Sequence, residues 1–219
     1  LFMLLMGLDA FKTEDSTSHD LPEGKVDLDR EEVKRRLPHI DKILDPEIER
    51  EVIDVTASSP KYFWEVPAST SEYHHPLCRG KHGLWIHTLM VATVVERLKD
   101  TYTEQDLIPG NKIDEVRAAA LLHDQRKNGP AHRPKNTSTS NHNKFMGDVI
   151  RVESELSDNV ARMVDTHMGE WYDGPSPRNH SEQLLHTADM IASDENIEID
   201  IMKPIPEELK ELGVGGYSK

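Results

Sequence analysis

A histidine and an aspartate that stand side by side, His123 and Asp124, carry the clearest chemical signal in this sequence. They follow a run of small and apolar residues at 118–122, and Lys127 and Gly129 come directly after them. An imidazole nitrogen and a carboxylate oxygen are both ligands for divalent cations, and neighbouring residues can reach one ion from adjacent directions. The dipeptide alone is common, so its meaning depends on what other segments supply.

Other segments supply three histidines and a second aspartate on the apolar stripes of predicted helices. Helical periodicity predicts helices at about 84–99, 113–123, 141–156, 157–167 and 180–193. Taken singly, each histidine on such a stripe is more often a hydrogen-bonded core residue than a ligand. A buried carboxylate, however, must be paired or must bind a cation. Chance convergence of so many such residues on buried helix faces is improbable, so we predict a metal site from His87, His123, Asp124, His142, His167 and Asp189.

The remaining patterns predict an all-α single domain with a helical core at 28–194. Further helices are predicted at 29–37 and 45–58, the second with Asp45 as N-cap and Pro46 at its first position. Residues 1–27 form a partly mobile lead-in, apolar at 1–8 and polar at 9–27. Residues 195–219 form a peripheral tail in which alternation at 196–201 indicates a short strand. Loops 66–82 and 128–140 are expected to shape the pocket, and the second should be exposed.

Composition limits the partners and the compartment. A net charge of -14 argues against a broad nucleic-acid-binding surface, although Arg126, Lys127, His132, Arg133 and Lys135 indicate a local basic pocket. The one cysteine, Cys78, rules out an internal disulfide and fits a reducing cytoplasm. No apolar run is long enough to span a bilayer, so no membrane partner is expected. The oligomeric state is left open.

The order of the candidate ligands resembles the His-Asp (HD) superfamily of metal-dependent phosphohydrolases. The segment 123–129 reads His-Asp-x-x-Lys-x-Gly, and 186–193 contains the closing aspartate, Asp189. Segments 67–69, 74–75 and 82–88 resemble the subgroup related to the HD domain of bacterial 3′→5′ exoribonucleases and to lone phage and archaeal HD proteins. The resemblance covers about residues 45–193 and implies a helical bundle with a metal site in its core.

By this resemblance, His87, His123, Asp124 and Asp189 bind one metal ion, and Asp124 can bridge to a second ion held by His142 and His167. The sequence departs from two-metal members in two places. Met168 stands where many of them have a second histidine, and His142 precedes Gly147 by one residue more than expected. One ion or two therefore both stay open. The mixed ligand set suits Mn, Fe, Co, Ni or Zn better than Mg.

The resemblance implies hydrolysis of a phosphate ester by a metal-activated water, with Asp124 and Lys127 as catalytic residues. Lys127, Arg133 and Lys135 are the predicted contacts to substrate phosphates, although solvated loop or helix-end charge is the plain alternative for each. The expected substrate is a nucleotide or a small phosphodiester. Three alternatives remain, namely a 3′→5′ nuclease on short single strands, a di-iron oxygenase with the same ligand order, and a regulatory domain without turnover.

Overall fold

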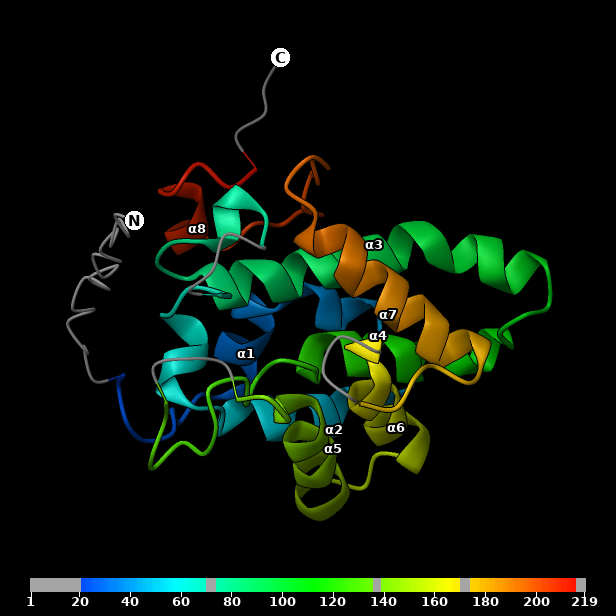
Figure 1. The fold of residues 1–219 in the computed structure, drawn as a ribbon, viewed down its shortest axis with the longest axis horizontal. Coiled ribbons are helices and arrows are strands. Elements are labelled where there is room, and N and C mark those ends of the chain that lie inside the picture. The colour runs from blue at the N-terminus through cyan, green and yellow to red at the C-terminus, as the bar shows by residue number, and fades with distance from the viewer. Residues whose placement is uncertain (1–20, 70–73, 136–138, 170–173, 216–219) are drawn as a thin grey trace, which may run out of the picture.

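The structure is a computed structural model that describes residues 21–69, 74–135, 139–169 and 174–215. Its helices form an all-α bundle, as the sequence predicts (Figure 1). The α-helices are α1 (Arg30–Arg36), α2 (Pro46–Ala57), α3 (Gly83–Glu104), α4 (Ile113–Leu122), α5 (His142–Glu153), α6 (Asp158–Thr166), α7 (His180–Ser193) and α8 (Glu207–Lys210). The short 3-10 helices are η1 (Pro38–Lys42), η2 (Lys61–Trp64), η3 (Pro76–Cys78) and η4 (Gly110–Lys112).

Helix starts follow from side chains that satisfy otherwise unpaired backbone N–H groups. The Asp45 carboxylate accepts from the N–H of Glu47 at 2.9 Å, and Pro46 occupies the first helical position, as predicted. Asn179 caps α7 in the same way by accepting from the N–H of Glu182 at 3.0 Å. These local caps fix where α2 and α7 begin.

Helix α4 lies at the centre of the bundle, in contact with α2, α3, α6 and α7. Its alanines, Ala118, Ala119 and Ala120, are fully buried. Because their side chains are small, the neighbouring helices can approach its backbone closely. Helix α3, the longest, runs alongside α7, and α5 packs against α6 as a hairpin (Figure 1). The ends of α4 and α6 and the start of α5 are thereby brought into one region of the core.

The aromatic segment before α3 packs into this core. Tyr62 and Phe63 are fully buried, and Trp64 is nearly so. The described part of the lead-in is also docked, because Gly24 N–H donates to Ala131 O at 2.7 Å and Val26 N–H to Ser59 O at 2.8 Å. Residues 1–20 lie outside the described part of the chain.

Two predictions about the C-terminal segment need correction. The predicted strand at 196–201 is wrong, because this part of the described chain is irregular. Ile199 and Ile201 are buried, so apolar side chains do alternate towards the core here. The described backbone has no partner strand, however, and it bonds to α3 instead, with Met202 N–H donating to Thr93 Oγ1 at 3.1 Å. The tail is also less peripheral than predicted, since Leu209 in α8 is fully buried.

No described helix is both long and apolar enough to cross a bilayer.

His39 links η1 to α3 and gives a prediction about acid stability. Its Nε2 lies 2.9 Å from Thr93 Oγ1, and burial lowers the pKa of His39 from 6.5 to about 4. Between about pH 6.5 and pH 4, the His39 imidazole is protonated in the unfolded chain but not in the folded chain. The free energy of unfolding therefore falls as the pH drops through this range. At pH 5 the loss from this residue is about 2 kcal/mol. In His39→Gln this pH-dependent contribution to the free energy of unfolding should disappear.

The measurement is urea unfolding of wild type and His39→Gln at pH 7 and pH 5. The difference in unfolding free energy between the two pH values should be smaller in the variant by about 2 kcal/mol. Equal pH dependence in both proteins would show that His39 is not the titrating group.

Candidate metal centre

The carboxylate of Asp124 is the point on which the candidate ligands converge. Asp124 follows the end of α4, and only 1% of it is exposed. Its Oδ2 lies 3.7 Å from His123 Nε2 and 4.0 Å from His87 Nε2. Its Oδ1 lies 3.3 Å from His142 Nε2 and 3.6 Å from His167 Nε2. The two carboxylate oxygens thus face two separate pairs of histidines.

Each of these histidines comes from a different part of the bundle. His87 lies on α3, His123 directly follows α4, His142 begins α5, and His167 directly follows α6. Asp189 on α7 completes the predicted set, with its Oδ1 at 2.9 Å from His87 Nε2. All six predicted ligands are therefore brought together.

Backbone hydrogen bonds set the tautomer of three of the rings. Nδ1 of His123 lies 2.8 Å from Ala120 O, that of His142 lies 2.9 Å from Thr139 O, and that of His167 lies 2.7 Å from Val164 O. A carbonyl oxygen only accepts, so each Nδ1 donates its proton. In the neutral ring Nε2 then carries a lone pair, which is the form that binds a metal.

The Nε2 lone pairs and the Asp124 carboxylate are both electron-rich, so this arrangement calls for a cation between the rings and the carboxylate. Nε2 of His123 and Nε2 of His167 are buried and have no hydrogen-bond partner among the described residues. Two groups can each close around an ion, with ligand atoms within 4.8 Å of one another: His87, His123 and Asp124 in one, and Asp124, His142 and His167 in the other. The residues present therefore fit a divalent metal. Nitrogen and carboxylate oxygen together suit a transition metal better than Mg.

Burial and neighbouring charges together shift the pKa values of the cluster. Burial alone would raise the pKa of Asp124, but Lys127 and the surrounding histidines hold it well below its usual range. Burial lowers the pKa of His123 to about 4, which keeps its ring neutral. Burial also acts to lower the pKa of His167, but the nearby carboxylates of Asp124 and Asp189 outweigh it and raise the pKa.

Lys127 completes the surroundings of Asp124. Only 5% of Lys127 is exposed, and its Nζ donates to Asp124 Oδ2 at 2.6 Å. The same Nζ lies 3.5 Å from Nε2 of His74, a loop residue to which the sequence assigns no chemistry. Only the folded chain reveals this contact, because 53 residues separate the two side chains.

The residues of the predicted basic pocket lie in different surroundings in the structure. Arg126 is buried and faces Glu153, with 3.9 Å between Nη2 and Oε2, so it belongs to the packing between the turn and α5. Arg133 and Lys135 are exposed, and the described residues give no ion pair between either of them and Asp124. Their role in substrate binding stays a prediction. The predicted exposure of loop 128–140 is wrong at its start, because Asn128 and Ala131 are buried.

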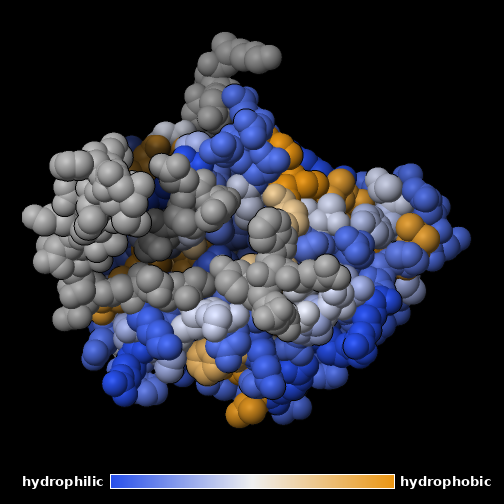
Figure 2. Space-filling view, in the orientation of Figure 1, coloured by the Kyte–Doolittle hydropathy of each residue, from blue (hydrophilic) through white to orange (hydrophobic). Residues whose placement is uncertain are grey.

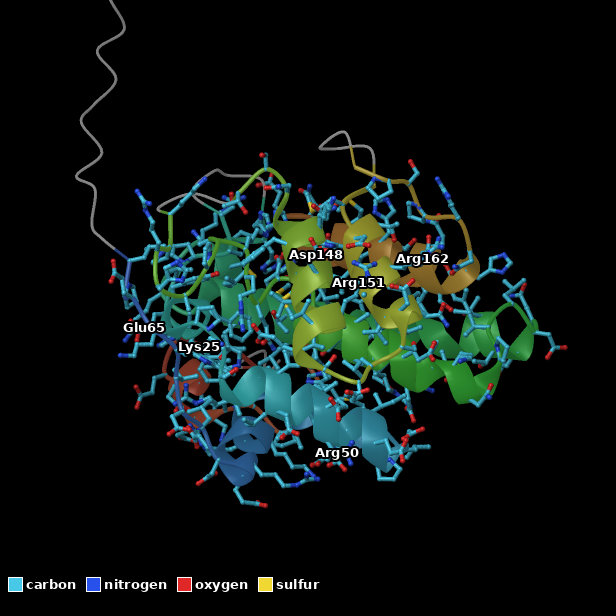
Figure 3. All side chains as sticks on the ribbon, turned by 90° about the horizontal axis from the view of Figure 1, so that it is seen from below. Lys25, Arg50, Glu65, Asp148, Arg151 and Arg162 are labelled. Carbon is cyan, nitrogen blue, oxygen red and sulfur yellow. The ribbon has the colours of Figure 1, made fainter. Side chains whose placement is uncertain are left out.

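The shared carboxylate predicts how metal binding responds to mutation. Asp124→Asn keeps the side-chain size but removes the charge that both groups use, so affinity for Mn²⁺ should fall by more than the roughly 10- to 100-fold typical of residues that only support a ligand. Asp148→Asn is the matched control, because Asp148 lies on the exposed side of α5 beside Arg151 (Figure 3). Its affinity should equal that of wild type.

Binding is read by titration calorimetry and by elemental analysis after dialysis. His142→Ala removes a ligand from one group only, so a drop from two ions to one in this variant would establish two sites. Unchanged affinity in Asp124→Asn would remove Asp124 from the metal centre.

The comparisons with known proteins agree with this geometry. The family model described as the HD domain matches residues 84–199, which is more than half of the chain and includes His87, Asp124 and Asp189. Neither the curated proteins nor the solved structures gave a match. A closer subgroup is therefore not identified. With its His-Asp cluster built from α3 to α7, the chain belongs to the HD domain family.

Proposed function

We propose that the protein is a metal-dependent phosphohydrolase that acts on a nucleotide or a small phosphodiester. Membership of the HD domain family indicates metal-dependent hydrolase activity, and the His-Asp cluster is suited to a divalent ion. The observation that carries the proposal is the ammonium of Lys127 beside the ligand carboxylate of Asp124. A metal site with an adjacent buried cation is suited to a substrate whose reacting group is anionic.

In this proposal the metal ligands and Lys127 have different catalytic roles. A bound divalent ion lowers the pKa of water and neutralises phosphoryl oxygens. The histidine rings are held by backbone carbonyls, so their Nε2 atoms keep their direction without rearrangement. The strongly lowered pKa of Asp124 makes it a weak proton acceptor, so we assign it to orienting the attacking water. Lys127 places positive charge where the phosphoryl group gains negative charge.

The surface charge favours small substrates. The net charge is -14, and the face seen in Figure 2 is largely hydrophilic. Such a charge repels a long polyanion, whose binding depends on a basic surface. A free nucleoside phosphate or a small phosphodiester needs only the few cations near the metal. Cleavage of short single strands is the nearest alternative, with Arg133 and Lys135 as contacts to further phosphates.

The test is a hydrolysis panel on metal-stripped protein reloaded with Mn²⁺. The substrates are dNTPs, NTPs, nucleoside monophosphates, cyclic dinucleotides and short oligonucleotides, and products are identified by mass. Wild type and Asp148→Asn should cleave one class, and Asp124→Asn should not. If no substrate is cleaved and the purified protein holds two irons, the phosphohydrolase proposal fails and a di-iron oxygenase takes its place.

Lys127→Met tests the second catalytic group. The variant should keep its metal, because no ligand is lost, while kcat falls by about 100- to 1,000-fold, as when a transition-state donor is removed. The control is Lys144→Met, which removes a lysine on the exposed side of α5. Steady-state kinetics with the substrate found in the panel gives the comparison. A wild-type kcat in Lys127→Met would show that this lysine does not touch the reacting phosphate.

A further inference from the structure

His74 reaches the metal centre from a loop outside the helical bundle. The loop between η2 and α3 brings its Nε2 to 3.5 Å from Lys127 Nζ. On the other side, its ring packs edge-on against the ring of His87, with 5.1 Å between the ring centroids. The Lys127 ammonium therefore lies between two different acceptors, the charged carboxylate of Asp124 and the imidazole of His74.

The backbone at His74 and directly after it is held by side-chain contacts. Arg79 Nε donates to His74 O at 2.6 Å, and Arg79 Nη2 reaches Glu195 Oε2 beyond α7 at 2.6 Å. The next residue, His75, caps η3 by accepting from the N–H of Leu77. These contacts fix the loop against α7 and η3, so the approach of His74 to Lys127 is built into the fold.

The two acceptors act differently on the ammonium. A lysine ammonium only donates, so His74 must accept at Nε2 and carry its own proton on Nδ1. Asp124 neutralises the positive charge that it binds, and a carboxylate whose charge is shared with a metal ion binds an ammonium less strongly. A neutral imidazole holds the ammonium in place without cancelling its charge. Lys127 has a long flexible side chain, and His74 adds a second direction to the one in which Asp124 already holds its ammonium.

We propose that His74 is a positioning residue: as a neutral second acceptor it keeps the Lys127 ammonium at one place beside Asp124, from which the ammonium faces the phosphoryl group of the substrate. This inference rests on the proposed function, because it gives Lys127 a phosphate to meet. It assigns to the loop before α3 a part in the reaction that neither the family match nor the ligand order contains.

A double-mutant cycle tests whether His74 acts through Lys127. His74→Ala should lower kcat by about 10-fold or more, the order found for residues that orient an active-site group, with little change in KM. In a Lys127→Met background the same change should have no further effect. His74→Gln should recover part of the activity, because its amide oxygen can accept near the position of Nε2.

The matched control is His75→Ala, which removes the η3 cap and so loosens the same loop. Because this variant keeps the His74 imidazole, its effect on kcat should be smaller than that of His74→Ala. An effect of His74→Ala that persists in full without Lys127 would overturn the inference, because it would mean that His74 only supports the loop.

A measurement without turnover separates this inference from the proposed function. Nitrogen-15 NMR of the imidazole side chains reports which ring nitrogen carries the proton. In wild type, His74 should be protonated at Nδ1 and unprotonated at Nε2, and Lys127→Met should weaken this preference. If His74 carries its proton on Nε2, the inference is wrong even if phosphate esters are cleaved. If the expected tautomer is found and nothing is cleaved, the contact stands and the proposed substrate class fails.

Discussion

A carboxylate buried at the centre of the bundle is the constraint on which the rest of the structure depends. Burying an ionised carboxylate without a partner costs several kcal/mol, and Asp124 is almost completely buried. Lys127 supplies one positive charge at Oδ2, while Oδ1 faces the rings of His142 and His167. The core therefore balances this charge with Lys127 on one side, and the rings on the other side are suited to a metal ion.

The helices do more than carry the ligands to this point. His123, His142 and His167 each bond through Nδ1 to a carbonyl three residues earlier in the chain. For His123, which directly follows α4, that carbonyl belongs to the last turn, where oxygens lack a partner within the helix. At the end of α6, Val164 O accepts both from the His167 ring and from the backbone N–H of His167. One hydrogen bond thus satisfies a helix end and fixes a ligand. A ligand at the end of a helix therefore has its ring oriented by the helix backbone, without a second side chain, which suits a small scaffold.

Much of this arrangement could be predicted from the sequence, because its causes are local. Asp45 and Pro46 mark the start of α2, and the apolar stripes place His87 and Asp189 on buried faces. What the sequence did not reveal depends on contacts between distant segments. The contact of His74 with Lys127 needs a folded loop. Ile199 and Ile201 alternate like a strand although the described chain forms no strand there. Arg126 stands among basic residues in the chain but is turned towards Glu153.

The docked segment 21–28 has a consequence for the loop that follows the metal centre. Gly24 N–H donates to Ala131 O, and Thr139 N–H donates to Lys127 O, so both ends of this loop are tied to backbone elsewhere. Free-energy coupling between two sites is reciprocal. Any ligand that binds this loop more tightly when Gly24 is docked therefore strengthens the attachment of residues 21–28 by the same free energy. The first described residues of the chain are in this sense energetically linked to the backbone that follows Lys127.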